Sequence, residues 1–181
     1  MVSSSFLVLF SAFASLALGE SFNLYAYGDG IGGLPLHYAD GKTHRHSSRA
    51  AVISQNAPKD AKDTDVVSFT TSNGRLIGNP NATSSDPPFS NTILYIPDSE
   101  STSHEIGFVN DTDSAPANKL INRFIWYGHF LLVENDEGEL TSLFSVKESA
   151  SEGEYSLLWN VTDSDEDVIT VSMRSIAPST N

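Results

Sequence analysis

Aromatic residues set beside polar groups are the feature of this sequence best suited to binding chemistry. Tyr25 and Tyr27 fall on one face of an alternating run, and Trp126 and Tyr127 stand close to His129. An exposed flat ring can stack on a sugar or hold a small hydrophobic molecule, while neighbouring polar groups orient the ligand. Rings in β-proteins more often fill the core, but where one face is exposed we predict Tyr27, Trp126 and His129 as ligand-binding residues.

Two other segments carry partial metal-ligand spacing. His44 and His46 would share one face of an extended chain, with His37 across a turn, and neutral imidazoles can hold a transition metal. The alternating acids of residues 163–167 resemble calcium ligands, but the Gly and Glu that an EF-hand loop carries at its sixth and twelfth positions are missing. We therefore expect a solvent-exposed loop and an acidic turn, with no metal and no cofactor.

The sequence offers no catalytic residue that can be named. Glycoside hydrolysis needs two carboxyl groups roughly 5–10 Å apart, and Glu105, Glu134 and Glu139 are the best placed because they flank apolar runs. No serine stands in a nucleophile-elbow motif. The segment 28–33 matches G-x-G-x-x-G, but extended chain follows it instead of the helix that a dinucleotide site requires. Enzymatic activity stays open, and the motifs favour a non-enzymatic role.

The acidic composition narrows the classes of partner. The 181 residues include 23 acids and 10 bases, for a formal net charge of -13. A protein that binds nucleic acid needs a basic face, and an anionic membrane surface repels an acidic protein, so we expect neither as a partner. Cys is 0, which excludes disulfides, thiolate catalysis and cysteine-ligated zinc.

The amino terminus has the composition of a secretory signal peptide. An uncharged apolar run of about 13 residues extends from Phe6 to Leu18, and it is shorter than the roughly 20 residues that a membrane-spanning helix needs. Small residues three and one positions before Glu20 are typical of a signal-peptidase site. We therefore predict a signal peptide at 1–19 and a single secreted domain at 20–181.

Three sequons, at Asn81, Asn110 and Asn160, are expected glycosylation sites in an exported chain. Ser, Thr and Asn are abundant here, so the positions of the sequons carry more weight than their number. Asn81 and Asn110 stand among turn-forming residues, where a glycan is sterically tolerated, and Asn160 follows a predicted strand.

The dominant sequence period is two, which is the alternation of a β-strand. Short apolar runs recur between Gly, Asn, Asp, Ser and Pro, and Asn73-Gly74 is the strongest hairpin signal. Residues 115–121 are expected to form one helical turn at most, and residues 42–64 and 79–90 irregular connections. We predict an all-β protein, a single antiparallel β-sandwich or barrel of about ten short strands. The predicted strands lie at residues 22–27, 34–38, 66–70, 75–77, 92–96, 105–109, 123–127, 129–134, 140–146, 154–159 and 168–173.

Two blocks of the sequence resemble known secreted proteins. The opening block, within Phe22–Lys42, resembles a group of small secreted fungal proteins. The later layout is similar to that of fungal cell-wall proteins of the phialide-associated type, with a dipeptide turn in Phe69–Leu76, Gly107-Phe108 in a strand and Tyr155–Trp159 late in the chain. The resemblance spans most of the mature chain and implies an extracellular or cell-wall location. Its motifs are structural and imply no catalytic residues.

These features together predict a secreted, non-enzymatic protein of the fungal cell surface or cell wall, with a structural or glycan-binding role. Two alternatives stay open: a small-molecule-binding protein or cofactor-free cyclase with a barrel pocket, and a secreted effector directed at a host. A hollow barrel lined by polar groups would favour the small-molecule alternative, and a filled core would count against it. The expected partners are cell-wall glycans or a small hydrophobic ligand, and the oligomeric state stays open.

Secretion of the full chain from a eukaryotic host is expected to yield a mature protein that begins at Glu20, because Ala17 and Gly19 fit the signal-peptidase pocket. Amino-terminal sequencing of the secreted protein checks this site. The substitution Gly19→Leu should block or shift cleavage. A secreted protein that still begins at Met1 would contradict the prediction.

Overall fold

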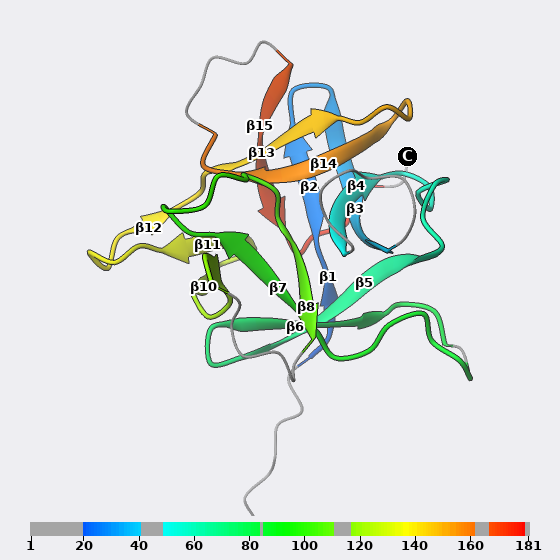
Figure 1. Ribbon diagram of the computed structural model, residues 1–181, viewed down its shortest axis with the longest axis horizontal. Coiled ribbons are helices and arrows are strands. Elements are labelled where there is room, and N and C mark those ends of the chain that lie inside the picture. The colour runs from blue at the N-terminus through cyan, green and yellow to red at the C-terminus, as the bar shows by residue number, and fades with distance from the viewer. Residues whose placement is uncertain (1–19, 41–48, 84, 111–116, 162–166, 180–181) are drawn as a thin grey trace, which may run out of the picture.

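Every regular element of the described structure is a β-strand. The computed structural model describes the chain apart from residues 1–19, 41–48, 84, 111–116, 162–166 and 180–181, and this described part contains no helix (Figure 1). It accordingly holds no helix that is long and apolar enough to cross a membrane. The all-β prediction is confirmed. The strands are β1 (Phe22–Asn23), β2 (Tyr25–Gly28), β3 (Ile31–Asp40), β4 (Ala50–Ser54), β5 (Asp63–Ser72), β6 (Arg75–Pro80), β7 (Thr92–Pro97), β8 (Gly107–Asn110), β9 (Lys119–Leu120), β10 (Phe124–Tyr127), β11 (Phe130–Glu134), β12 (Leu140–Thr141), β13 (Phe144–Glu148), β14 (Glu154–Trp159) and β15 (Val168–Arg174).

Backbone pairing closes these strands into an antiparallel barrel. Ten strands follow one another around a circuit in the order β2, β3, β5, β6, β7, β8, β4, β14, β13 and β15. The circuit closes because β15 pairs with β2, where Arg174 lies opposite Tyr25 and Val171 opposite Gly28. A further pairing of β3 with β4 crosses the circuit. The hairpin of β10 and β11, extended by β12, attaches to β15 through Phe130 opposite Arg174.

The turns follow the residues that tolerate left-handed backbone. Asn73 and Gly74 have φ values of 50° and 73° and connect the paired residues Ser72 and Arg75, as a two-residue hairpin turn requires. Within the glycine-rich segment 28–33, Asp29 and Gly30 form the turn between β2 and β3, since Gly28 lies opposite Ile31. The dinucleotide interpretation, which needed a helix at this point, is therefore excluded.

One strand lies where irregular chain was expected, so that prediction was wrong. β4 falls within residues 42–64, and its residues Ala51–Ser54 are all buried. It pairs with β3 on one side and with β14 on the other, and Ala50 also lies opposite Gly107 of β8. A short apolar run inside polar sequence carries a weak local signal, and the neighbouring strands stabilise it instead. Residues 115–121 were expected to form at most one helical turn, but the short strand β9 occupies part of this segment.

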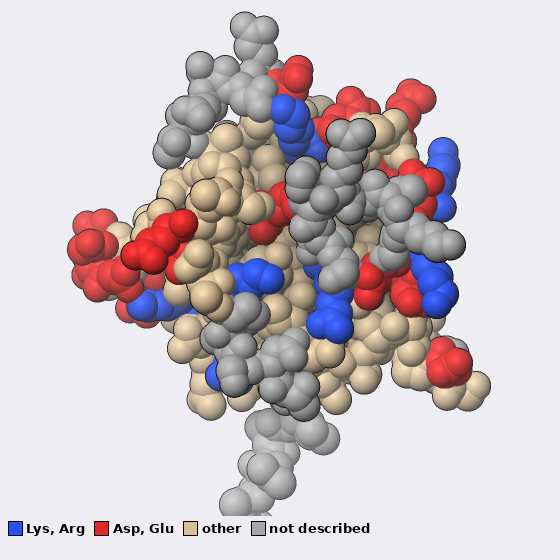
Figure 2. All heavy atoms as spheres, viewed as in Figure 1, with Lys and Arg blue, Asp and Glu red and all other residues tan. Residues whose placement is uncertain are grey.

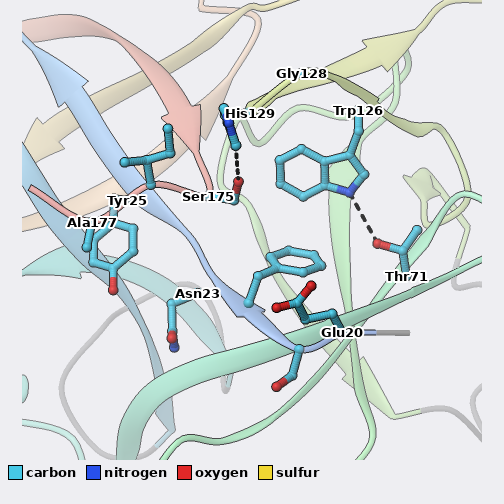
Figure 3. A pocket seen from close by; sticks show the side chains of 12 residues that line it. Glu20, Asn23, Tyr25, Thr71, Trp126, Gly128, His129, Ser175 and Ala177 are labelled. Atoms are coloured by element: carbon cyan, nitrogen blue, oxygen red, sulfur yellow. Dashed lines mark hydrogen bonds between the residues drawn. The ribbon is translucent and has the colours of Figure 1, made fainter. Parts of the chain in front are cut away.

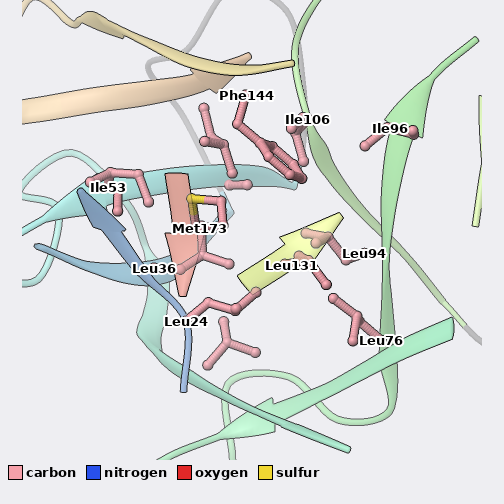
Figure 4. Close-up of a cluster of buried hydrophobic side chains, with 14 of the residues drawn as sticks. Leu24, Leu36, Ile53, Leu76, Leu94, Ile96, Ile106, Leu131, Phe144 and Met173 are labelled. Carbon is pink, nitrogen blue, oxygen red and sulfur yellow. The ribbon is translucent and has the colours of Figure 1, made fainter. Parts of the chain in front are cut away.

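Large apolar side chains fill the interior of the barrel (Figure 4). The alternation predicted for the first strands holds, because Leu24 and Ala26 are fully buried while Tyr25 and Tyr27 point away from the core and are half-buried. The Phe69 ring lies 6.1 Å from that of Phe22 on one side and 6.4 Å from that of Phe108 on the other, measured between centroids. This packing leaves the potential binding surfaces on the outside of the barrel.

Truncating a leucine is expected to cost far more free energy inside this core than outside it. Leu76 is 0% exposed, so Leu76→Ala should lower the free energy of unfolding by about 2–5 kcal/mol. Leu140 is 46% exposed, and Leu140→Ala should change it by less than about 0.5 kcal/mol. Urea unfolding followed by circular dichroism measures both. Equal losses in the two variants would contradict the described core.

Candidate ligand-binding site

A surface pocket of about 620 Å³ lies where the two ends of the domain meet the β10–β11 turn (Figure 3). Its volume falls in the range of small-molecule and sugar sites, about 300–1,000 Å³. In Figure 3, Trp126 and His129 lie on one side of the pocket, and Glu20 and Asn23 on the other. The lining residues are Glu20, Ser21, Phe22, Asn23, Tyr25, Thr71, Trp126, Gly128, His129, Ser175, Ile176 and Ala177.

Trp126 provides the main aromatic surface of this pocket. Its ring meets Phe22 edge to face, with 4.8 Å between centroids and 89° between ring planes. The indole nitrogen Nε1 donates a hydrogen bond to Oγ1 of Thr71 at 3.2 Å. Because Phe22 also stacks on the buried Phe69, the ring of Trp126 is held against the core. The side chain remains only half-buried, so part of it stays accessible to a ligand.

The polar side of the pocket begins at the β10–β11 turn. Tyr127 and Phe130 are paired, and Gly128, with a φ of 59°, and His129 make the two-residue connection between them. The backbone N–H of Ser175 donates to the carbonyl of His129 at 3.0 Å, and Oγ of Ser175 lies 3.4 Å from Nδ1 of His129. These contacts tie the turn to the carboxyl-terminal segment and fix the imidazole at the rim.

The amino-terminal segment supplies the opposite polar side. Asn23 donates through Nδ2 to the backbone carbonyl of Val67 at 2.9 Å, which leaves its Oδ1 available to accept a hydrogen bond. Glu20 adds an exposed carboxylate. An aromatic surface bordered by a carboxylate, an amide, an imidazole and hydroxyl groups can hold a ligand that has both an apolar face and several hydroxyl groups.

Of the three predicted binding residues, the structure brings Trp126 and His129 together in this pocket, while Tyr27 stands behind its wall. The hydroxyl of Tyr27 donates to the backbone carbonyl of Ile176 at 2.8 Å, so this side chain positions the carboxyl-terminal segment. Sequence reasoning missed Phe22 and Thr71, because contacts between segments about 50 to 100 residues apart have no local signal.

The predicted glycosylation sites occupy different surroundings. Asn81, just after β6, and Asn160, just after β14, are exposed, and Asn160 has a φ of 52°. Asn110 is half-buried at the end of β8. The sequon residues Thr112 and Thr162 lie outside the described residues.

The residues considered for metal binding and catalysis do not meet in the pocket. His44, His46, Asp163 and Asp165 lie outside the described residues, and the described part contains no group of three His, Cys, Asp or Glu that could hold a metal.

The glutamates considered for glycoside hydrolysis also lie elsewhere. Glu134 and Glu139 flank the β11–β12 hairpin turn, where Oε2 of Glu139 accepts a hydrogen bond from Nδ2 of Asn135 at 3.2 Å. Glu105 lines a separate pocket of about 290 Å³ together with Glu100.

A second pocket, of about 500 Å³, surrounds Tyr38. Its hydroxyl donates to Oδ2 of Asp40 at 3.3 Å, and its ring stacks on Phe89 with 4.2 Å between centroids. Burial, followed by the negative charge of Asp40, raises the pKa of Tyr38 to about 12. The phenol is therefore protonated at neutral pH and cannot act there as a base.

His37 is buried on β3, and no group of metal-binding side chains surrounds it among the described residues. Its side chain is 4% exposed, and neither ring nitrogen has a hydrogen-bond partner of good geometry in the described structure. Burial lowers the pKa of His37; the backbone of Ser54 and the charges of Asp65 and Glu154 oppose this shift without reversing it. Glu154 is itself buried, and its Oε1 accepts the backbone N–H of Lys59 at 3.0 Å.

The lowered pKa of His37 is expected to make the fold less stable in mild acid. As the pH falls from about 7 through 6.5, the unfolded chain binds a proton at this histidine more readily than the folded chain, so the free energy of unfolding decreases. His37→Leu should flatten this dependence between pH 7.5 and about 5, above the usual range of Asp and Glu. His129→Leu, at an exposed histidine, should keep it. Urea unfolding at several pH values checks both, and identical pH profiles for the wild type and His37→Leu would contradict the assignment.

Comparison with protein-family models, curated proteins and solved structures finds no match to this chain. The likeness to fungal wall proteins therefore stays a prediction, and the functional argument depends on the pocket itself.

Proposed function

We propose that this protein is a secreted, non-enzymatic glycan-binding protein of the cell surface or cell wall, and that the pocket around Trp126 binds the glycan. The observation that carries the proposal is the half-buried Trp126 ring, held by Phe22 and Thr71 beside the polar groups of His129 and Asn23. A pyranose has an apolar face of C–H groups and an equatorial belt of hydroxyl groups. Such a ligand uses both the ring and the polar rim.

The position of the pocket favours a glycan over a small hydrophobic metabolite. The barrel interior is filled by side chains such as Phe69, Phe124 and Phe144, and the pocket lies outside this packing. A metabolite pocket or cyclase site would enclose its ligand among apolar side chains and exclude water. An open surface pocket instead suits one or two units of a longer chain whose other units continue into solvent.

The carboxylates of the pocket favour binding over hydrolysis. Among the described lining residues, Glu20 is the sole carboxylic acid, whereas glycoside hydrolysis ordinarily uses two that face each other across the scissile bond.

The predicted secretion of the chain also affects the rim of the pocket. The predicted signal-peptide cleavage leaves Glu20 as the first residue, and its new α-amino group would then stand at the rim of the pocket.

Removing the ring of Trp126 is expected to weaken retention on wall glycans. We expect Trp126→Ala to weaken binding at least tenfold, or about 1.4 kcal/mol, because the stacking surface is lost. Trp126→Phe should keep part of the affinity. The measurement is a glycan array together with a pull-down on purified fungal cell wall, using the mature protein from Glu20.

Leu143→Ala is the matched control, since Leu143 is 45% exposed and lies outside the pocket lining. This variant should bind as the wild type does. Absence of wild-type retention on both the array and the wall, or equal retention of wild type and Trp126→Ala, would refute the proposal.

A further inference from the structure

Arg174 is held between two aromatic rings on the outer face of the barrel. Its guanidinium carbon lies 4.8 Å from the ring centroid of Tyr27 and 4.6 Å from that of Phe130. The strand register explains this arrangement, because Arg174 of β15 lies opposite Phe130 of β11 and Tyr27 belongs to the neighbouring strand β2. Tyr127, which is 71% exposed and paired with Phe130, continues the same surface. We call these four residues the arginine strip.

The guanidinium is oriented but has no acidic partner among the described residues. Its Nε donates to Oγ of Ser172 at 3.1 Å, and the rings of Tyr27 and Phe130 lie close to its central carbon. Because Nε is engaged with Ser172, the terminal NH₂ groups are the remaining donors for a ligand. The edge that they form matches the two oxygens of a carboxylate in a bidentate pair.

Among the described residues, an arginine with no acidic partner is unusual for so acidic a chain. Acids outnumber bases by 23 to 10, and several basic side chains on the face shown in Figure 2 stand next to acidic ones. Arg123, for comparison, forms an ion pair with Asp136 at 2.6 Å. An arginine that is held in place with no carboxylate partner among the described residues is suited to accept one from outside.

The arginine strip adjoins the pocket around Trp126. The two surfaces meet at the β2–β15 pairing, because Tyr25, which lines the pocket, lies opposite Arg174 of the strip. Trp126 and Tyr127 are consecutive in β10, so their side chains leave opposite faces of the hairpin. They are joined a second time where the Tyr27 hydroxyl bonds the carbonyl of Ile176, a pocket residue. A glycan chain bound in the pocket can therefore continue past Tyr25 toward Arg174.

We propose that the arginine strip is a subsite for an acidic sugar, so that the preferred ligand is an oligosaccharide in which a uronic acid unit lies near neutral units. This inference rests on the proposed glycan-binding function and specifies its ligand. The carboxylate of the uronate pairs with the edge of Arg174, and the exposed rings of Phe130 and Tyr127 contact the sugar. The net charge of -13 disfavours polymers that are acidic at every unit, which limits the ligand to glycans with isolated acidic units.

The test compares matched oligosaccharides on the mature protein. Isothermal titration with a neutral glucose oligomer, and with the same oligomer carrying one glucuronate, should show about tenfold tighter binding of the acidic form. Arg174→Lys keeps the charge but loses the planar edge and should remove most of this preference, while Arg123→Lys should keep it. Thermal unfolding checks that the variants fold. Phe130→Leu, which removes one stacking ring, replaces Arg174→Lys if that variant is unstable, and it should also reduce the preference.

A second measurement tests the arginine strip separately from the pocket. The NMR signal of the Arg174 Nε–H group should shift on addition of sodium glucuronate and remain in place with glucose. Equal wild-type affinity for the neutral and acidic oligomers would overturn the subsite and leave the pocket proposal standing. No binding of either oligomer, with no shift by glucuronate, would overturn both. An equal shift with acetate or with a peptide carboxylate would overturn the assignment to a sugar.

Discussion

The pairing of β15 with β2 is the contact on which the rest of this structure depends. It joins residues near the two ends of the domain, placing Arg174 opposite Tyr25 and Met173 opposite Ala26, and it closes the barrel. With Cys at 0, no disulfide can hold these ends, so the hydrogen-bonded ladder and the buried side chains beneath it must do so. Closure also removes two sheet edges that would otherwise be open to pairing with other chains.

The candidate site is a consequence of the same closure. The pocket takes one wall from the segment before β2, another from the segment after β15, and its aromatic surface from Trp126 on a hairpin attached to β15. Each wall is fixed by contacts that cross these segments, such as Tyr27 to Ile176 and Ser175 to His129. Because the lining is held before a ligand arrives, little side-chain freedom remains to be lost on binding. The arginine strip arises from the same register, which brings Tyr27, Arg174 and Phe130 together.

Local features of this architecture could be predicted from the sequence. The alternation of Leu24 and Ala26 with Tyr25 and Tyr27 correctly put the two pairs on opposite faces of a strand, without saying which face is inward, and Asn73-Gly74 correctly marked a hairpin turn. These features follow from the two-residue period of a strand and from the backbone freedom of Asn and Gly, both of which act over a few residues.

Features that depend on distant contacts could not be predicted. β4 is a short apolar run in polar surroundings, and it is a strand because β3 and β14 flank it. The arrangement of the pocket likewise had no local signal. Trp126 and His129 were chosen for their chemistry, but their partners Thr71 and Ser175 lie 55 and 46 residues away in the sequence. Tyr27 was chosen for the same reason, and its position behind the wall depends on where the chain end packs.

Acrylamide quenching of tryptophan fluorescence tests the central claim most directly, because the protein has 2 tryptophans in contrasting positions. Trp126 is half-buried at the pocket, and Trp159 is 8% exposed in the core beside Phe144. If the pocket binds the glycan, a saturating wall oligosaccharide will shield Trp126, and quenching will fall toward the low level of a buried tryptophan such as Trp159. Unchanged quenching at a concentration that saturates binding would show that the glycan is held elsewhere and would contradict the account.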